Sequence, residues 1–171
     1  MFIRYATIDD APGMARTKVD TWRSAYSGII DGDYLYSLSY AEVEGRFRNS
    51  MSIPAQGERF MVVEDRSKIV GFTIYGLERA VASVERGEIY AMYVRPERQG
   101  EGIGRKLLVA AASKLKEDGM RSLIIWTLEQ GKSRQFYEKL GGCPCGTKNA
   151  CIGGKYYVHV AYCWPISALL K

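Results

Sequence analysis

The sequence predicts an α+β fold built on one mixed sheet. Three strand-like segments follow one another between residues 59 and 94, and helical and strand-like segments alternate between residues 105 and 164. Consecutive strands favour antiparallel pairing, whereas a strand, helix, strand order requires at least one crossover connection. With 171 residues, the chain is expected to form a single domain, 1–171, with one functional site.

The N-terminal third is expected to hold one strand and two helical regions. Residues 2–6 alternate and are rich in β-branched and aromatic side chains, which favours a half-buried strand. Residues 7–30 carry apolar side chains near helical spacing, and Gly28 ends that helix. Residues 32–51 are expected to form a second helical region, which stops before a proline.

The central segments predict three strands, at 59–65, 69–76 and 87–94. The connection between the first two is short enough for an antiparallel hairpin.

The C-terminal half has a different pattern. Residues 105–118 place apolar side chains on one face and charges elsewhere, which predicts an amphipathic helix that Gly119 ends. A buried strand at 121–128, a short helix at 133–140 and a last strand at 155–164 complete the expected elements.

Composition narrows the possible partners. The net charge of +5 suits an anionic partner such as the phosphate of a small molecule. The chain lacks the arginine-rich run or aromatic-interleaved basic strand of a nucleic-acid binder, so no nucleic-acid partner is expected. No apolar stretch approaches the roughly 18 residues of a membrane span, and the N-terminus does not resemble a signal peptide. We therefore expect no membrane association and a cytoplasmic location.

The cysteines do not predict a metal site. Cys143, Cys145, Cys151 and Cys163 all lie in the last 30 residues, but a zinc site favours paired C-x-x-C spacing or closely spaced histidines, and the chain has only His159. We expect no metal, and reduced, partly buried thiols on C-terminal strands.

A glycine-rich stretch between a strand and a helix indicates phosphate binding. Gly100, Gly102 and Gly104 expose backbone where the first N–H groups of a helix have no partner within the helix, and such groups bind phosphate oxygens. A P-loop is excluded because Lys106 precedes Leu107 rather than Ser or Thr, and the spacing does not fit the dinucleotide G-x-G-x-x-G pattern. The alternative is a glycine turn that only caps a helix.

The same stretch contains Q-x-x-G-x-G, as Gln99, Gly102 and Gly104, which resembles the acetyl-CoA pyrophosphate loop of the GNAT family of N-acetyltransferases. Residues 87–108 resemble the family's fourth strand, loop and third helix, and residues 133–142 resemble its second conserved segment. The resemblance covers nearly the whole chain. It implies a mostly antiparallel sheet that is splayed between its fourth and fifth strands and flanked by helices.

The resemblance implies acetyl-CoA as the donor, with no metal. The backbone of Met92, Tyr93 and Val94 would pair with the pantetheine amides as an added strand does. The diphosphate-binding loop corresponds to Gln99, Gly100, Glu101, Gly102, Ile103, Gly104 and Arg105. Cations for the other phosphates are available at Arg95, Arg98, Arg105 and Lys106. Further cofactor contacts would come from Gln130, which replaces the asparagine of many relatives, and from Ser133 and Phe136.

Acetyl transfer needs an unprotonated amine and a protonated leaving thiol. An amine with a pKa of about 10.4 is mostly charged at neutral pH, so a base, or a site that lowers the pKa of the amine, is required. Glu88 resembles the acidic residue that many relatives place on this strand, and Tyr137 resembles the family's general acid. The alternatives are that Glu88 is an exposed residue at a strand end and that Tyr137 is a core aromatic.

The acceptor pocket is expected among the first helices, where Trp22 and Tyr26, together with Tyr90, would line it or else belong to the core. The expected function is direct acetyl transfer from acetyl-CoA to a primary amine of a small molecule or a protein N-terminus. The alternative is a CoA-binding sensor domain that has lost turnover. A homodimer is the expected assembly, because symmetric dimers are the commonest oligomers.

Overall fold

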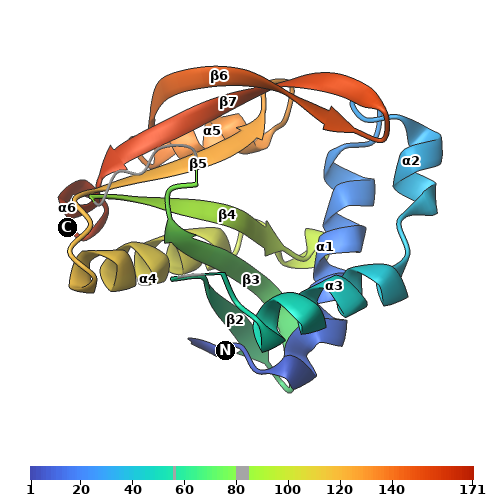
Figure 1. Cartoon of the computed structure of the whole chain (residues 1–171), viewed down its shortest axis with the longest axis horizontal. Coiled ribbons are helices and arrows are strands. Elements are labelled where there is room, and N and C mark those ends of the chain that lie inside the picture. The colour runs from blue at the N-terminus through green and yellow to red at the C-terminus, as the bar shows by residue number, and fades with distance from the viewer. Residues whose placement is uncertain (56, 80–84) are drawn as a thin grey trace.

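The computed structural model describes residues 1–55, 57–79 and 85–171 (Figure 1). Seven strands form one sheet in the order β1-β2-β3-β4-β5-β7-β6. The strands are β1 (Phe2–Tyr5), β2 (Arg59–Asp65), β3 (Lys68–Leu77), β4 (Arg86–Val94), β5 (Ser122–Leu128), β6 (Cys143–Ile152) and β7 (Lys155–Pro165). The helices are α1 (Ala11–Ala25), α2 (Gly32–Ser37), α3 (Tyr40–Ser52), α4 (Ile103–Glu117), α5 (Ser133–Lys139) and α6 (Ile166–Leu169), with short 3₁₀ turns η1 (Ile8–Asp10) and η2 (Pro96–Arg98).

The sheet is antiparallel except between β4 and β5, which run parallel and are joined through α4. The β2–β3 hairpin pairs from Arg59 with Tyr75 to Asp65 with Lys68. This arrangement confirms the predicted mixed sheet with one crossover connection.

Helices cover both faces of the sheet. The face that packs on α4 holds the larger core cluster, in which Leu108 and Leu115 of α4 meet Ile89 of β4 and Leu123 of β5. The opposite face packs on α1 and α3, where Val19 of α1 belongs to a second core cluster. Burial of these two apolar layers provides the main driving force for folding.

A β-bulge in β4 sets which side chains of this strand share a face. Ala91 pairs with Ile74 and Ile89 pairs with Tyr75, so Tyr90 is an extra residue on β4. Beyond the bulge, Met92 packs on the α4 side, whereas Ala91 and Tyr93 pack on the α1 side.

Two secondary-structure predictions were wrong. Residues 32–51 form two helices rather than one, because Leu38 is extended and the Ser39 side chain accepts a hydrogen bond from the backbone N–H of Glu42, which begins α3. Strand β6 was not predicted, because its side chains are mostly exposed and show no apolar alternation. Its turn to β7 is the two-residue Gly153-Gly154 sequence, a hairpin signal.

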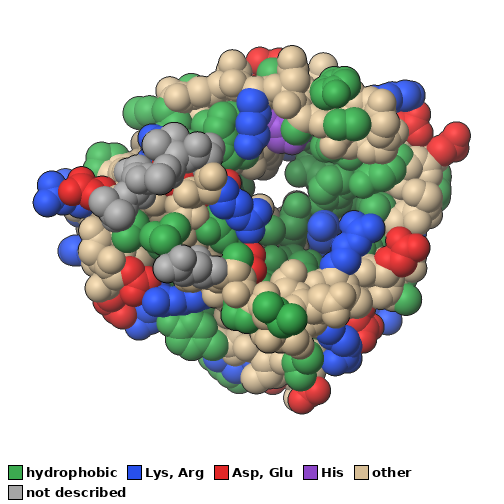
Figure 2. All heavy atoms as spheres, viewed as in Figure 1, with side chains coloured by type: hydrophobic (Ala, Val, Ile, Leu, Met, Phe, Trp, Pro, Cys, Tyr) green, Lys and Arg blue, Asp and Glu red, His purple; other side chains and the backbone are tan. Residues whose placement is uncertain are grey.

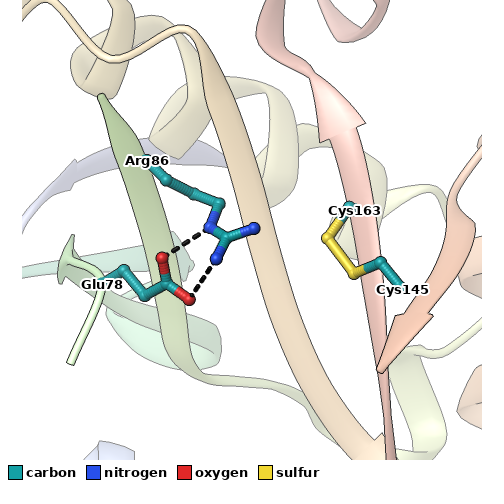
Figure 3. Close-up of a disulfide and its surroundings, with 4 residues drawn as sticks. All are labelled: Glu78, Arg86, Cys145 and Cys163. Atoms are coloured by element: carbon teal, nitrogen blue, oxygen red, sulfur yellow. Dashed lines mark hydrogen bonds and ion pairs between the residues drawn. A yellow bond between two sulfur atoms is a disulfide. The ribbon is translucent and has the colours of Figure 1, made fainter. Parts of the chain in front are cut away.

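The prediction of four reduced thiols was also wrong. Cys145 of β6 and Cys163 of β7 form a disulfide (Figure 3). Cys145 lies at a register irregularity between Pro144 and Gly146, which places it beside Cys163 on the neighbouring strand. Cys143 and Cys151 are free, and both are exposed rather than partly buried.

The described residues hold neither a candidate metal site nor a candidate membrane span. Residues 1–55, 57–79 and 85–171 contain no group of three or more His, Cys, Asp or Glu side chains that could hold a metal ion. Within the same ranges, no helix has both the length and the apolar character needed to cross a bilayer.

Candidate active site

The sheet opens between β4 and β5. The two strands pair only from Arg86 with Ser122 to Ile89 with Ile125, and β5 continues to Leu128 with β7 as its partner. We call the space between residues 90–94 of β4, residues 126–128 of β5 and α1 the central opening. Figure 2 shows it as a hole surrounded largely by hydrophobic side chains, with Lys or Arg side chains at its edge.

The loop after β4 exposes backbone toward solvent. The Gln99 side-chain amide donates to the Val94 carbonyl at 3.1 Å, which ties the loop to the strand end. Gly100 and Gly102 have φ of +84° and +77°, and beyond the adjoining backbone no atom of a described residue lies within 4 Å of a Cβ built on either. No side chain caps the N-terminus of α4, so its first N–H groups remain free to bind an anion such as the diphosphate of CoA.

The third glycine has a different function in the fold. A Cβ built on Gly104 would lie 3.0 Å from the Cζ of Phe136 on α5. Gly104 therefore allows α4 and α5 to pack closely, whereas Gly100 and Gly102 provide the exposed backbone.

The cations near this loop differ in how they are paired. Arg98 binds Asp65 at 2.9 Å and Glu101 at 2.8 Å, so its charge is compensated within the protein. Arg105 and Lys106 are exposed, and neither has an ion-pair partner among the residues that the structure describes. These two side chains are the ones available for a further phosphate.

The other candidate cofactor residues lie around the same strand ends. The Ser133 hydroxyl hydrogen-bonds with the Thr127 hydroxyl at 2.6 Å, so it is already partnered within the protein. Gln130 is exposed in the loop before α5, and Met92 and Val94 pack on the α4 side of β4. The backbone of β4 after Ile89 lacks β5 as a partner, which suits an added extended ligand such as pantetheine.

Tyr137 lies on α5 and is 5% exposed. Its ring packs against Phe136, Tyr162 and Trp164, with centroids 5.2, 5.8 and 5.9 Å away. Burial raises the pKa of Tyr137 above its ordinary value, so the phenol keeps its proton at neutral pH. The residue is thus a member of the core whose buried phenol remains protonated.

Aromatic side chains from α1 and β4 lie near this phenol. Burial raises the pKa of Tyr26, and the phenols of Tyr93 and Tyr137 raise it further, so these three side chains are near enough to interact electrostatically. Trp22 stacks edge-on against Tyr26, with centroids 5.1 Å apart. The structure therefore brings together Tyr137, Trp22 and Tyr26. Tyr93 was predicted to contribute only its backbone, and the position of its side chain was not predicted.

Glu88 lies elsewhere on β4. It is 8% exposed, so it is not the solvent-facing residue of the alternative interpretation, and its carboxylate accepts a hydrogen bond from the Arg79 backbone N–H. The Arg79 guanidinium lies 3.5 Å from the centroid of the Tyr90 ring, whose hydroxyl donates to the Leu77 carbonyl. Glu88 and Tyr90 thus form a polar group with Arg79.

A pocket of about 370 Å³ lies between the α1–α2 connection and β7. Its lining includes Leu35, Tyr157 and the ion pair of Asp31 with Lys155 at 2.6 Å, but neither Tyr137 nor Glu88. The pocket is therefore separate from the Tyr137 phenol.

Comparison with known proteins agrees with this geometry. A family model described as an acetyltransferase (GNAT) domain matches residues 56–141. The chain is 34% identical over 169 residues to the uncharacterized N-acetyltransferase YuaI of Bacillus subtilis, covering 99% of this chain and 95% of that protein. It is 30% identical over 88 residues to the [ribosomal protein bS18]-alanine N-acetyltransferase of Haemophilus influenzae, covering 50% and 57% of the two chains. The structure of the PaiA N-acetyltransferase of Thermoplasma acidophilum with coenzyme A superposes with a TM-score of 0.71 at 20% identity, covering 93% and 96%.

Proposed function

Because the chain belongs to the GNAT acetyltransferase family and is an acetyl-CoA-dependent acetyltransferase, we propose that it acetylates a primary amine directly. The acceptor is a small molecule or a protein N-terminus. The Haemophilus influenzae relative, whose name gives a ribosomal-protein alanine as its acceptor, supports the second possibility. The observation that carries the proposal is the buried, protonated Tyr137 phenol beside the aromatic residues of α1.

The donor would be held by backbone more than by side chains. The loop from Gln99 to Arg105, with the free N–H groups of α4, would bind the diphosphate, and the backbone of Met92, Tyr93 and Val94 would bind the pantetheine. Acetyl-CoA supplies an acetyl thioester, whose C–S bond breaks as the C–N bond to the acceptor forms.

Two proton transfers fall to side chains of this chain. Tyr137 holds a proton on its phenol oxygen and would deliver it to the departing sulfur. Glu88 would accept a proton from the attacking amine, through a water where the amine is not in direct reach. Oε2 of Glu88 already accepts the Arg79 N–H, and Oε1 has no hydrogen bond to any residue in the described ranges.

The acceptor would enter along the aromatic side of α1. Trp22 and Tyr26, whose rings stack edge-on, are the proposed wall of the acceptor pocket, and the Tyr26 phenol interacts electrostatically with that of Tyr137. Tyr90, which is bonded to Leu77 and stacked under Arg79, would contribute on the Glu88 side.

The test is to incubate the purified protein with acetyl-CoA and a panel of amines while measuring free thiol. We expect amine-dependent thiol release and intersecting initial-rate lines, since direct transfer requires both substrates to be bound together. CoA binding without thiol release for any amine would favour the sensor alternative, and parallel lines would favour a covalent enzyme intermediate.

A further inference from the structure

Lys18 is a half-buried lysine on α1 that the proposed mechanism does not use. Its ammonium lies 5.6 Å from the centroid of the Trp22 ring and 5.8 Å from that of the Phe47 ring. Within the described ranges, no carboxylate pairs with it. Burial lowers the pKa of Lys18, and the positive charge of Arg46 lowers it further.

Two neighbouring cations in this part of the protein are partnered. Arg48 pairs with Glu44 at 2.8 Å, and Arg23 donates to carbonyls at the end of α2, including that of Leu38 at 2.8 Å. Arg46, like Lys18, has no ion pair with any described residue. Placing a desolvated ammonium beside a second cation costs stability unless an anion joins them.

The position of Lys18 relates it to the acceptor side of the site. Lys18, Trp22 and Tyr26 are spaced four residues apart on α1, so they lie along one stripe of the helix. Tyr26, at the far end of this stripe, is close to the Tyr137 phenol. The indole Nε1 of Trp22, in the middle of the stripe, is buried, lies beside the Tyr93 side chain and has no well-aligned hydrogen-bond acceptor among the described residues.

The anions of the donor would be bound elsewhere. The diphosphate loop precedes α4, which packs on one face of the sheet, whereas Phe47 and the α1 residues around Lys18 pack on the other. An anion at Lys18 would therefore belong to the second substrate.

We propose that Lys18 binds a carboxylate or phosphate group of the acceptor and so selects amines that carry an anion. This proposal rests on the proposed acetyl transfer to an amine. It assigns the recognition of the acceptor to α1 and leaves the chemistry to Tyr137 and Glu88.

The experiment compares matched amines that differ in one anionic group. The pairs are phenylalanine with phenylalaninamide, β-alanine with β-alaninamide, and phosphoethanolamine with ethanolamine. Binding to the protein saturated with CoA is measured by calorimetry, in which no transfer occurs, and KM and kcat are then measured with acetyl-CoA. The first two pairs test a carboxylate and the third tests a phosphate.

The variants separate charge from packing. Lys18→Met keeps the apolar stem and removes the ammonium, Lys18→Arg keeps the charge, and Lys116→Met makes the same substitution at an exposed position of α4. We expect the unchanged protein to prefer the anionic member of at least one pair. Lys18→Met should raise the Kd and KM of the anionic amine about tenfold or more. The kcat for this amine should change little, and so should the binding of the neutral amine. Lys18→Arg should retain most of the preference, and Lys116→Met all of it.

Two results would overturn the proposal: the unchanged protein shows no preference in any pair, or the preference persists in Lys18→Met. A second outcome separates the two proposals. If the anionic amine binds more tightly in a way that depends on Lys18, but no amine causes CoA thiol to be released from acetyl-CoA, the anion site is supported and the transferase function is refuted.

Discussion

The Glu88 carboxylate accepts a hydrogen bond from the backbone N–H of Arg79, with 2.9 Å between Oε2 and that nitrogen. The same carboxylate is the proposed base, so Glu88 has one structural contact and one proposed chemical role. A glutamine at this position can still accept the N–H bond through its side-chain oxygen but cannot act as a base at neutral pH.

We therefore expect Glu88→Gln to lower kcat/KM by about 100-fold and to remove the acidic limb of its pH profile, with little loss of stability. The control is Glu78→Gln, because Glu78 is also buried but pairs with Arg86 (Figure 3). This control should reduce the melting temperature without changing the pH profile. An unchanged acidic limb in Glu88→Gln would exclude Glu88 as the base.

Tyr137→Phe should lower kcat by about 100-fold or more and leave CoA affinity nearly unchanged. The substitution removes the hydroxyl but keeps the ring that packs on Tyr162 and Trp164. Tyr162→Phe is the control, because the Tyr162 hydroxyl donates to Glu138 at 2.6 Å rather than lying beside Tyr26. Single-turnover rates and CoA calorimetry are the measurements, and equal single-turnover rates in Tyr137→Phe and the unchanged protein would refute the role.

Two glycines of the loop should respond differently to alanine. Gly102→Ala places a side chain at φ +77°, which costs about 1–2 kcal/mol and disturbs the exposed loop, so CoA affinity should fall. Gly104→Ala brings a Cβ to 3.0 Å from Phe136, the neighbour of Tyr137, so kcat should fall more than CoA affinity. Calorimetry with CoA and steady-state kinetics distinguish the two cases. The opposite assignment of effects would contradict the division between these glycines.

Lys18→Met should stabilise the protein at neutral pH. Folding lowers the pKa of Lys18 below 10.5, so the charged lysine favours the unfolded chain at every pH below its folded-state pKa. The penalty disappears as the pH rises from that value to above 10.5, where the lysine is neutral in both states. Thermal unfolding across this range should show the Met variant more stable by roughly 2–4 °C near pH 7 and its advantage shrinking at high pH. Lys116→Met should show no such trend.

The Cys145–Cys163 disulfide should contribute to stability. It closes a sequence separation of 18 residues, for which a loop-entropy estimate gives about 3 kcal/mol. Cys145→Ser should lower the free energy of unfolding in urea by up to this amount, and a reductant should have no further effect on the variant. Cys151→Ser, at an exposed free thiol, is the control. Equal unfolding curves for Cys145→Ser and the unchanged oxidised protein would contradict this contribution.

The sequence predicted those elements whose pattern depends on burial. Strands β2 to β5 and helix α4 have one or two buried faces, which impose apolar runs or periodicity. Strand β6 is an edge strand with mostly exposed side chains, so no hydrophobic pattern marks it, and only the Gly153-Gly154 pair signals the hairpin. The disulfide depends on the β6–β7 register, which the spacing of the cysteines does not determine.

The candidate site was predictable to a similar extent. The glycine loop and Tyr137 belong to local motifs, so their positions follow from short segments. The proximity of Tyr93 to Tyr26 depends on how α1 crosses β4, and the bulge at Tyr90 shifts which residues of β4 face that helix. Lys18 could not be singled out, because a lysine on a helix is most often solvated and only the packing of Trp22 and Phe47 shows otherwise.

The tip of the β6–β7 hairpin rests on α2, where a Cβ on Gly153 would lie 2.6 Å from the Tyr34 ring. The Asp31–Lys155 ion pair and a hydrogen bond from the Asp31 N–H to the Tyr157 hydroxyl join the same two segments. Contacts that each involve at least one side chain therefore join these segments, which lie more than 100 residues apart in the chain. Substitutions where the β6–β7 hairpin meets α2 can change the shape of the proposed acceptor pocket while β4, the glycine loop and α4 stay intact. The choice of amine can therefore change without loss of acetyl-CoA binding.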